Sequence, residues 1–436
     1  SAWLRTRRFW VQILAGAPLM NKIFKFEMIY YLLGISLIAR ILVFYTLGDT
    51  KLVDEWGIII NNFKVSGVFG FNVVVNEFIA LPKYAEPGEE VLPTIFMPPL
   101  YFYFIYLIEF LSGSYLNFVS VIIYTQIVFS LISTWLIFKI MLMLKQEIKF
   151  ALILTTIFAL FPVYVFSSSQ ISSISIQIFL LISYFFSLLK FENNSKFLYL
   201  LLFSISAGLL MLIRGEFFLF YFLTLIYFFV FKEKKFKSLV ISIILSILVL
   251  SPYLKRNYDN FNKLTLTKSF GYNLLKGNNP SFKVEGDSAY IENNFDRKTL
   301  NIKTNNNYEI NLDNFYRDKA TNLILNDPFN YLILYVKKIF SFIFIDFNSS
   351  YPNYYNFLHI FPKIFVSILS LFGAIIALKQ KGFFQFLSIY YLSNIFLFSI
   401  FFILPRYSLI LLPVQLLLTI EVFKYFKRKI VQLTPQ

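Results

Sequence analysis

Two adjacent carboxylates, Asp54 and Glu55, stand a few residues beyond the first long apolar stretch of the chain and precede Trp56. Such a pair near a bilayer surface can supply a general base, because partial burial brings a carboxyl pKa close to the working pH. A solvated acidic loop without a chemical role is the alternative interpretation.

Three arginines stand at the ends of apolar stretches: Arg214 in LLMLIRGEFFLF, Arg256 in SPYLKRNY and Arg406 in LPRY. An arginine at such depth costs about 2.5–3.5 kcal/mol unless it reaches water, a carboxylate or an anion. Guanidinium groups offer fixed, bidentate donors, which suit an anionic leaving group such as phosphate. The alternatives are ordinary topology signals and, for Arg214, a structural ion pair with Glu216.

The composition indicates a membrane protein. Of 436 residues, 58% are hydrophobic and 20% aromatic, which is more apolar surface than a soluble protein of this length can bury. The absence of cysteine excludes disulfides and thiolate chemistry, and the single histidine, His359, excludes a multi-histidine metal site. The net charge of +16 comes with lysines at the ends of apolar stretches, which indicates anionic lipid headgroups rather than nucleic acid as partners.

Ten apolar stretches suit the bilayer, which a helix of about 20 residues crosses. They cover residues 28–47, 117–144, 150–167, 170–189, 197–213, 215–231, 238–252, 359–378, 383–403 and 407–423. Every second connector is rich in lysine, as at 145–149, 190–196, 232–237 and 379–381, and the chain ends in a basic tail. The positive-inside rule therefore predicts an all-α polytopic protein of about ten transmembrane helices, with both termini in the cytoplasm.

The remaining connectors face the outer side: a first loop at 48–116, turns at 167–170 and 213–216, a segment at 253–358 and a turn at 404–407. Residues 98–112 are short for a span, so we expect a juxtamembrane or re-entrant helix. Two lysines interrupt the apolar stretch 329–345, Lys337 and Lys338, which predicts an amphipathic helix at the interface. The polar stretch 253–328 predicts an aqueous subdomain with a helix near 312–326, and it lacks a glycine-rich phosphate loop.

These connectors divide the chain into three parts. Residues 20–252 form an N-terminal transmembrane module with the first outer loop, 253–358 an outer-face subdomain with the interfacial helix, and 359–436 the C-terminal transmembrane helices with the basic tail. Residues 1–19 are basic with a short apolar run, and Met20 looks like a natural start. We therefore set residues 1–19 apart as an upstream extension or an expression remnant.

Six motifs follow one another in the order of a known family. They are DEW (54–56), PTIFMPPLYFYFIYLI (93–108), LLMLIRGEFFLF (209–220), SPYLKRNY (251–258), SFGYNLLKGNNP (269–280) and LPRYSLILLPV (404–414). In these motifs the chain resembles the bacterial integral-membrane glycosyltransferases of the GT-C superfamily, which contains protein O-mannosyltransferases and lipid A aminoarabinose transferases. It departs from them at Met97, where many relatives carry a basic residue or histidine, and at 167–177, where relatives often carry a glutamate.

The resemblance implies a sugar donor carried on a polyprenyl phosphate in the bacterial inner membrane, and an acceptor hydroxyl on a glycan, lipid or protein. Asp54 would accept the hydroxyl proton as the anomeric carbon inverts, with Glu55 as the adjacent alternative. Departing lipid phosphate would be stabilised by Arg214, Arg256 or Arg406. No cofactor is implied, and a metal is not obviously required. The substrate cavity would be lined by Pro98, Pro99, Tyr101, Glu216, Asn257, Tyr258 and Tyr407.

Two other functions remain open. A transporter or flippase of lipid-linked saccharides would also direct arginines toward a cavity, although transporters usually carry charged or broken segments near mid-membrane, and here the charges stand at span ends. A polysaccharide polymerase or O-antigen ligase would use the same type of donor. A cavity open only to the outer leaflet and loop would favour the transferase.

Overall fold

The computed structural model describes residues 27–75, 78–79, 82–113, 117–231, 236–296 and 300–433, so the predictions for residues 1–19 and for the lysines within 232–235 lie outside the described residues. Most of the described chain is helical. Within it, five helices are long and apolar enough to cross a membrane, which indicates a membrane-embedded helical protein. They are Glu27–Leu47, α4 (Phe118–Met143), α7 (Ile174–Asn194), α10 (Phe236–Phe261) and α15 (Phe357–Leu378).

Four of the other five predicted spans form shorter helices, and the last lies mainly in a helix of 22 residues. Three lie within the predicted stretches: α8 (Phe197–Ile213), α9 (Phe217–Phe231) and α16 (Phe383–Ser399). The stretch 150–167 divides into α5 (Ile148–Ala159) and α6 (Pro162–Ser167), because Pro162 cannot donate the amide hydrogen that would continue α5. The last stretch divides into α17 (Pro405–Leu409) and α18 (Leu412–Leu433). Ten complete crossings therefore stay a prediction.

The first outer loop contains a small sheet that the all-α prediction lacked. Three antiparallel strands lie in the order β2–β1–β3: β1 (Gly70–Val75), β2 (Phe78–Ile79) and β3 (Val91–Pro93). The run of three β-branched valines at 73–75 favours a strand, and β1, which pairs with β3, is mostly buried. The fold class is thus corrected to a mostly helical protein with one short sheet.

The polar segment after α10 folds around a core that it shares with Ile79 and Leu92 of the small sheet. Its helices are α11 (Phe270–Gly277), α12 (Ser288–Asn294), α13 (Tyr308–Asn326) and α14 (Pro328–Ile343). Leu275, Tyr316 and Ala320 are buried in this core. The helix predicted near 312–326 is confirmed by α13. The helix that contains the predicted span 238–252 is longer than the span, because α10 continues through Pro252 to Phe261 and carries Arg256 on its last turns.

The helix predicted for residues 329–345 is present as α14, but one of its two lysines points the other way from the expected polar face. Lys337 is exposed, whereas Lys338 is fully buried and its Nζ donates to Asn278 Oδ1 at 2.8 Å. The outward side of α14 is instead apolar, with Phe329 and Leu332 strongly exposed. A buried hydrogen-bond acceptor offsets the cost of removing this ammonium group from water.

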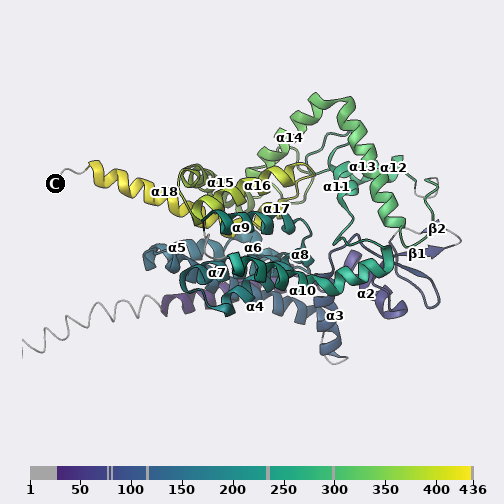
Figure 1. The fold of residues 1–436 in the computed structure, drawn as a ribbon, viewed down its shortest axis with the longest axis horizontal. Helices are drawn as coiled ribbons and strands as arrows, with labels where there is room; N and C mark the ends of the chain where they lie inside the picture. Colours follow the sequence, from purple (N-terminus) through teal and green to yellow (C-terminus); the bar gives the residue numbers. More distant parts are fainter. Residues whose placement is uncertain are drawn as a thin grey trace, which may run out of the picture.

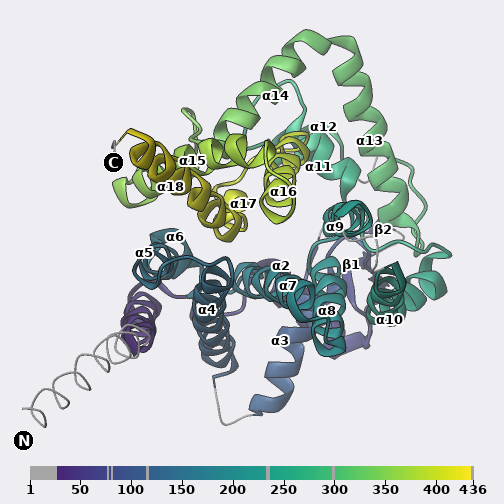
Figure 2. The ribbon, with the colours of Figure 1, turned by 60° about the vertical axis from the view of Figure 1, so that its left-hand side comes forward.

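The elements that form the outer loops gather at one end of the molecule. Figure 1 shows α2 (Asp54–Ser66), β1, β2, α12 and α13 at this end and the C-terminus at the opposite end. Figure 2 shows two groups of packed helices, one with α4, α7, α8 and α10 and the other with α15, α16 and α18. The short helix α3 (Pro99–Ser112), expected from residues 98–112, packs against α2, α4 and α8.

Candidate functional site

A cavity of about 750 Å³ lies where the connectors predicted for the outer face come together. Four of the five contribute lining residues, and the segment 171–174 lines the cavity in place of the predicted turn 167–170. Examples are Glu55 from the first loop, Ser172 from the connector before α7, Glu216 from the turn between α8 and α9, Tyr272 from α11 and Tyr407 from α17. Connectors distant in the sequence therefore build one site at one end of the helices.

Asp54 and Glu55 begin α2, and of this pair Glu55 lines the cavity while Asp54 does not. Both side chains are exposed. The backbone of Asp54 has φ 55°, in the left-handed region that few residues other than glycine adopt. Aspartate adopts this conformation more often than most other residues, and it begins α2 here.

A chain of buried contacts fixes α2 beside the cavity. The ring of Trp56 meets the ring of Tyr101 edge to face at a centroid distance of 4.8 Å. Tyr101 Oη then donates to Gln126 Oε1 at 2.8 Å, and Gln126 Nε2 donates to the carbonyl oxygen of Gln170 at 2.8 Å. Pro98 precedes α3, and both Pro98 and Tyr101 line the cavity as predicted from the motifs.

Arg214 forms the ion pair that the sequence offered as an alternative to phosphate binding. Its Nη1 lies 3.0 Å from Glu216 Oε1, and its guanidinium carbon lies 5.2 Å from the ring centroid of Tyr407. All three residues line the cavity. A guanidinium has five N–H donors, so this pairing still leaves donors for a ligand.

Three further cations line the cavity. Lys268 Nζ lies 3.8 Å from Asp313 Oδ2. The other two are Lys276 in the last turn of α11 and Arg406 in α17. Lys276 Nζ lies 4.6 Å from the ring centroid of Phe402. The pKa of Lys276 is lowered by burial and then by the positive charge of Arg406, while Glu55 acts in the opposite direction. Within the described residues, neither cation has a carboxylate at ion-pair distance. Two neighbouring cations of this kind suit a phosphate.

The motif GYNLLKGNNP positions Lys276. Asn278 Nδ2 donates at 2.9 Å to the carbonyl oxygen of Ile400, in the segment that leads to α17. Gly277 lies so close to this segment that a Cβ would meet the carbonyl oxygen of Phe401. Asn278 Oδ1 in turn accepts the hydrogen bond from Lys338 of α14. The end of α11 and the segment before Arg406 are therefore held together. The motif was identified from the sequence, but Lys276 was not predicted as a site residue.

Arg256 is tied to the first outer loop rather than to the cavity. Its Nη1 donates to the carbonyl oxygen of Thr94 at 2.7 Å, and its Nη2 donates to that of Phe69 at 2.9 Å. Arg256 is not among the described residues that line the cavity. These two hydrogen bonds connect the residue before β1 and the residue after β3 to the end of α10.

Three other residues expected in the cavity also lie outside its lining: Pro99, Asn257 and Tyr258. Pro99 is the first residue of α3. Asn257 is buried, and its Nδ2 donates to the carbonyl oxygen of Thr265 at 2.7 Å, which shapes the turn after α10. Tyr258 is half-exposed. These side chains shape the surroundings of the site.

Glu309, which sequence analysis did not single out, joins α13 to the first outer loop. Its carboxylate accepts hydrogen bonds from Asn72 Nδ2, Thr94 Oγ1 and the Ile95 amide, each at 2.8 Å at the closest. Burial raises the pKa of Glu309, and these hydrogen bonds act against the rise. No motif marks this glutamate, because its partners lie more than two hundred residues earlier in the chain.

The described residues include no group of three or more His, Asp and Glu side chains that could hold a metal ion. The chain matches no protein-family model and no curated protein. The chemistry of the site therefore has to be argued from its own groups. Of the described residues that line the cavity, four are cations, Arg214, Lys268, Lys276 and Arg406, and six carry carboxylates, Glu55, Glu216, Glu292, Asp296, Glu309 and Asp313. This set can accept a proton and hold an anion.

Proposed function

We propose that the protein is an inverting glycosyltransferase of the GT-C type, which moves a sugar from a polyprenyl-phosphate donor to an acceptor hydroxyl at the outer face of a bacterial inner membrane. One observation carries this proposal: Glu55 shares a cavity with Lys276 and Arg406, and neither cation has an ion-pair partner among the described residues. Transfer from a lipid phosphate requires both a proton acceptor and an anion site. The cavity offers both at the end of the apolar helices.

In the proposed reaction, the acceptor oxygen attacks the anomeric carbon while the bond from that carbon to the phosphate oxygen breaks. The bonding electron pair leaves with the lipid phosphate, and Lys276 and Arg406 stabilise its negative charge. Glu55 accepts the proton of the acceptor hydroxyl. The sequence favoured Asp54 for this role, and the proposal moves it to Glu55 because Glu55 lines the cavity.

A lipid-linked donor is supported by the position of the main cavity at one end of apolar helices. A lipid chain can stay in the bilayer there while its phosphate faces Lys276 and Arg406. The narrow cleft that shares Arg214, Glu216 and Tyr407 with this cavity has a volume of only about 20 Å³, which is too small for an isoprene unit. The polar segment 253–328 lacks a glycine-rich phosphate loop, and a lipid-linked donor requires none.

Mass spectrometry of the envelope glycolipids and glycoproteins tests this function in cells with and without the protein. We expect one class of glycan, lipid or protein to lose one sugar in its absence, while the polyprenyl-phosphate sugar accumulates at the outer face. Accumulation at the cytoplasmic face would indicate a flippase instead. An unchanged envelope with unchanged donor levels would contradict both functions.

A further inference from the structure

The segment 283–287, between α11 and α12, contacts both of the chain segments that carry the cations of the proposed phosphate site. The amide of Asp287 donates to the carbonyl oxygen of Lys276 at 2.8 Å. The amide of Ile403, just before α17, donates to the carbonyl oxygen of Val284 at 2.9 Å. We call residues 283–287 the bridging segment, because it connects the end of α11 to the start of α17.

Gly286 allows the bridging segment to lie close to both of these segments. Its backbone has φ 74°, in the left-handed region that glycine adopts without strain. A Cβ at this position would meet the carbonyl oxygen of Lys276 at 2.8 Å and the Cβ of Phe402 at 3.0 Å. The path of the bridging segment therefore sets the separation between the end of α11 and the segment before α17.

Glu285, at the centre of the bridging segment, connects it to the loop between α14 and α15. This glutamate is only 9% exposed. One carboxylate oxygen accepts hydrogen bonds from the amide and the hydroxyl of Ser350, at 2.9 and 2.8 Å, and the other accepts one from the hydroxyl of Ser349. Among the described residues, no lysine or arginine lies at ion-pair distance from Glu285. Hydrogen bonds to neutral groups therefore hold this buried charge.

The loop between α14 and α15 is itself fixed, and it lies near Arg406. The amide of Asp346 in this loop donates to Tyr354 Oη at 2.7 Å. Burial raises the pKa of Tyr351 in the same loop, while the positive charge of Arg406 acts against the rise and the negative charge of Glu285 adds to it. Both charges are therefore close to Tyr351, so Glu285 connects the bridging segment to a fixed loop beside the phosphate site.

We propose that Glu285 is a positioning residue for the phosphate site. Through the two serines it holds the bridging segment in place, and thereby keeps Lys276 and Arg406 at a separation that suits one phosphate. This inference rests on the proposed function for the identity of that phosphate. The negative charge of Glu285 alone would act in the other direction, because a carboxylate near two cations weakens their attraction for an anion. The two roles therefore predict opposite effects when Glu285 is replaced.

Titration of the full chain in lipid nanodiscs with a synthetic polyprenyl phosphate tests this role, with the uncharged polyprenol as the reference ligand. Glu285→Ala should weaken binding of the polyprenyl phosphate about tenfold, because the hydrogen bonds to the loop are lost. Glu285→Gln should bind it at least as tightly as the wild type. Its amide oxygen can accept from Ser350 and its NH₂ group can donate to Ser349, while the negative charge is absent. Polyprenol binding should not change.

A second variant keeps Glu285 and removes its side-chain partners. The combination of Ser349→Ala and Ser350→Ala should also weaken binding of the polyprenyl phosphate, by about threefold to tenfold, and it tests the role even where Glu285→Ala does not fold. The matched control is Glu421→Ala. Glu421 is a buried carboxylate of α18 that is bonded to Gln380 and Lys424, and none of these three residues lines the cavity. This variant should lose stability but keep its affinity.

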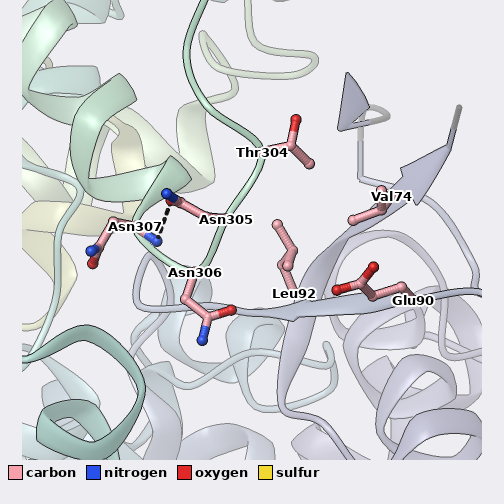
Figure 3. A pocket seen from close by; sticks show the side chains of 7 residues that line it. All are labelled: Val74, Glu90, Leu92, Thr304, Asn305, Asn306 and Asn307. Carbon is pink, nitrogen blue, oxygen red and sulfur yellow. Dashed lines mark hydrogen bonds between the residues drawn. The ribbon is translucent and has the colours of Figure 1, made fainter. Parts of the chain in front are cut away.

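A surface control comes from the same outer segment. Figure 3 shows Asn306 at a second pocket, of about 640 Å³, between the small sheet and the loop 304–307. This pocket shares no lining residue with the main cavity among the described residues. Asn306→Ala should therefore bind the polyprenyl phosphate as the wild type does.

Two results would overturn the positioning role: binding of the polyprenyl phosphate by Glu285→Ala at or above the wild-type level, or wild-type binding by the variant that lacks both serines. An equal loss of affinity in Glu421→Ala would also overturn it, because the loss would then reflect general destabilisation. Weak binding by Lys276→Met with normal binding by Glu285→Ala would remove this inference alone. Normal binding by Lys276→Met would remove the phosphate site and the inference together. Weak binding by both variants without any sugar transfer would preserve the positioning role and remove the transferase.

Discussion

Lys276 and Arg406 share one role in the proposed mechanism, so substitution of either should weaken the hold on the donor phosphate. Lys276→Met and Arg406→Ala should each lower the transfer rate by about 10²–10³-fold, because a positioned donor to the developing charge is lost. Arg406→Lys should restore only part of the rate, since an ammonium group cannot reproduce bidentate geometry. Titration with the polyprenyl-phosphate donor and single-turnover rates measure both effects, with the exposed Lys303→Met as the control. Unchanged donor binding in a variant that carries both Lys276→Met and Arg406→Ala would contradict the proposal that these two residues form the phosphate site.

Substitution of Arg256 should lower stability without weakening donor binding, in contrast to substitution of Lys276 or Arg406. Arg256→Met removes the hydrogen bonds to the carbonyl oxygens of Phe69 and Thr94, which should cost about 1–3 kcal/mol of stability. Donor affinity of the folded fraction should stay at the wild-type level. Thermal unfolding in detergent and donor titration separate the two effects. A stable variant with weak donor binding would return Arg256 to the phosphate site.

The sequence predicts which charged residues lie near the outer face, but it does not indicate which of them bind a ligand and which stabilise the fold. Arg214, Arg256 and Arg406 look alike because each follows an apolar stretch. Their roles differ through partners such as Phe69 and Thr94, which lie more than 150 residues away from Arg256 in the chain. Lys276 lies in the motif SFGYNLLKGNNP, but nothing in the neighbouring sequence indicates that it lies near Arg406.

At the scale of elements, α14 carries a buried lysine that should make stability depend on pH. Burial lowers the pKa of Lys338 to about 7, whereas an unfolded lysine keeps about 10.4. Between these values the unfolded chain binds more protons, so this residue makes stability rise with pH, by at most about 1.4 kcal/mol per unit. Below pH 7 both states are protonated, and the cost of the buried charge is constant.

Lys338→Met should remove this contribution. Thermal unfolding of both proteins from about pH 7 to pH 9.5 should show a smaller rise in stability for the variant than for the wild type. The comparison of slopes is independent of any constant loss caused by leaving Asn278 Oδ1 without its donor. Equal slopes for the two proteins would show that burial does not lower the pKa of Lys338 in the folded protein.

Helices and their approximate bounds follow from apolar stretches because burial in lipid or in a helical core demands long apolar runs. Shorter features need contacts that such runs do not encode. The strand β1 is stabilised by β3, which begins more than a dozen residues later after a turn, and the inward direction of Lys338 depends on Asn278. Both were missed for the same reason: their partners are not local.

For the whole molecule, the alternation of lysine-rich connectors predicts which end faces the cytoplasm. The chain contains no cysteine, so single cysteines can report on each side. Lys303→Cys, in the outer segment, should react with an impermeant maleimide in intact cells. Lys381→Cys, between α15 and α16, should react only after permeabilisation. Both positions are exposed, which makes the pair a matched comparison. The reverse pattern would invert the orientation and with it the location of the cavity.

The central claim is that this cavity cleaves a polyprenyl-phosphate sugar with a carboxylate as the base. The most direct measurement is release of polyprenyl phosphate by the full chain in nanodiscs. The substrates are the polyprenyl-phosphate sugars and acceptor glycans extracted from cells that lack the protein. Glu55→Gln should lower release by about 10²–10⁴-fold while donor binding persists, because the amide cannot accept the proton. Asp54→Asn should keep most of the rate. The reverse order would move the base to Asp54, and no release by the wild type, or full release by both variants, would contradict the proposed mechanism.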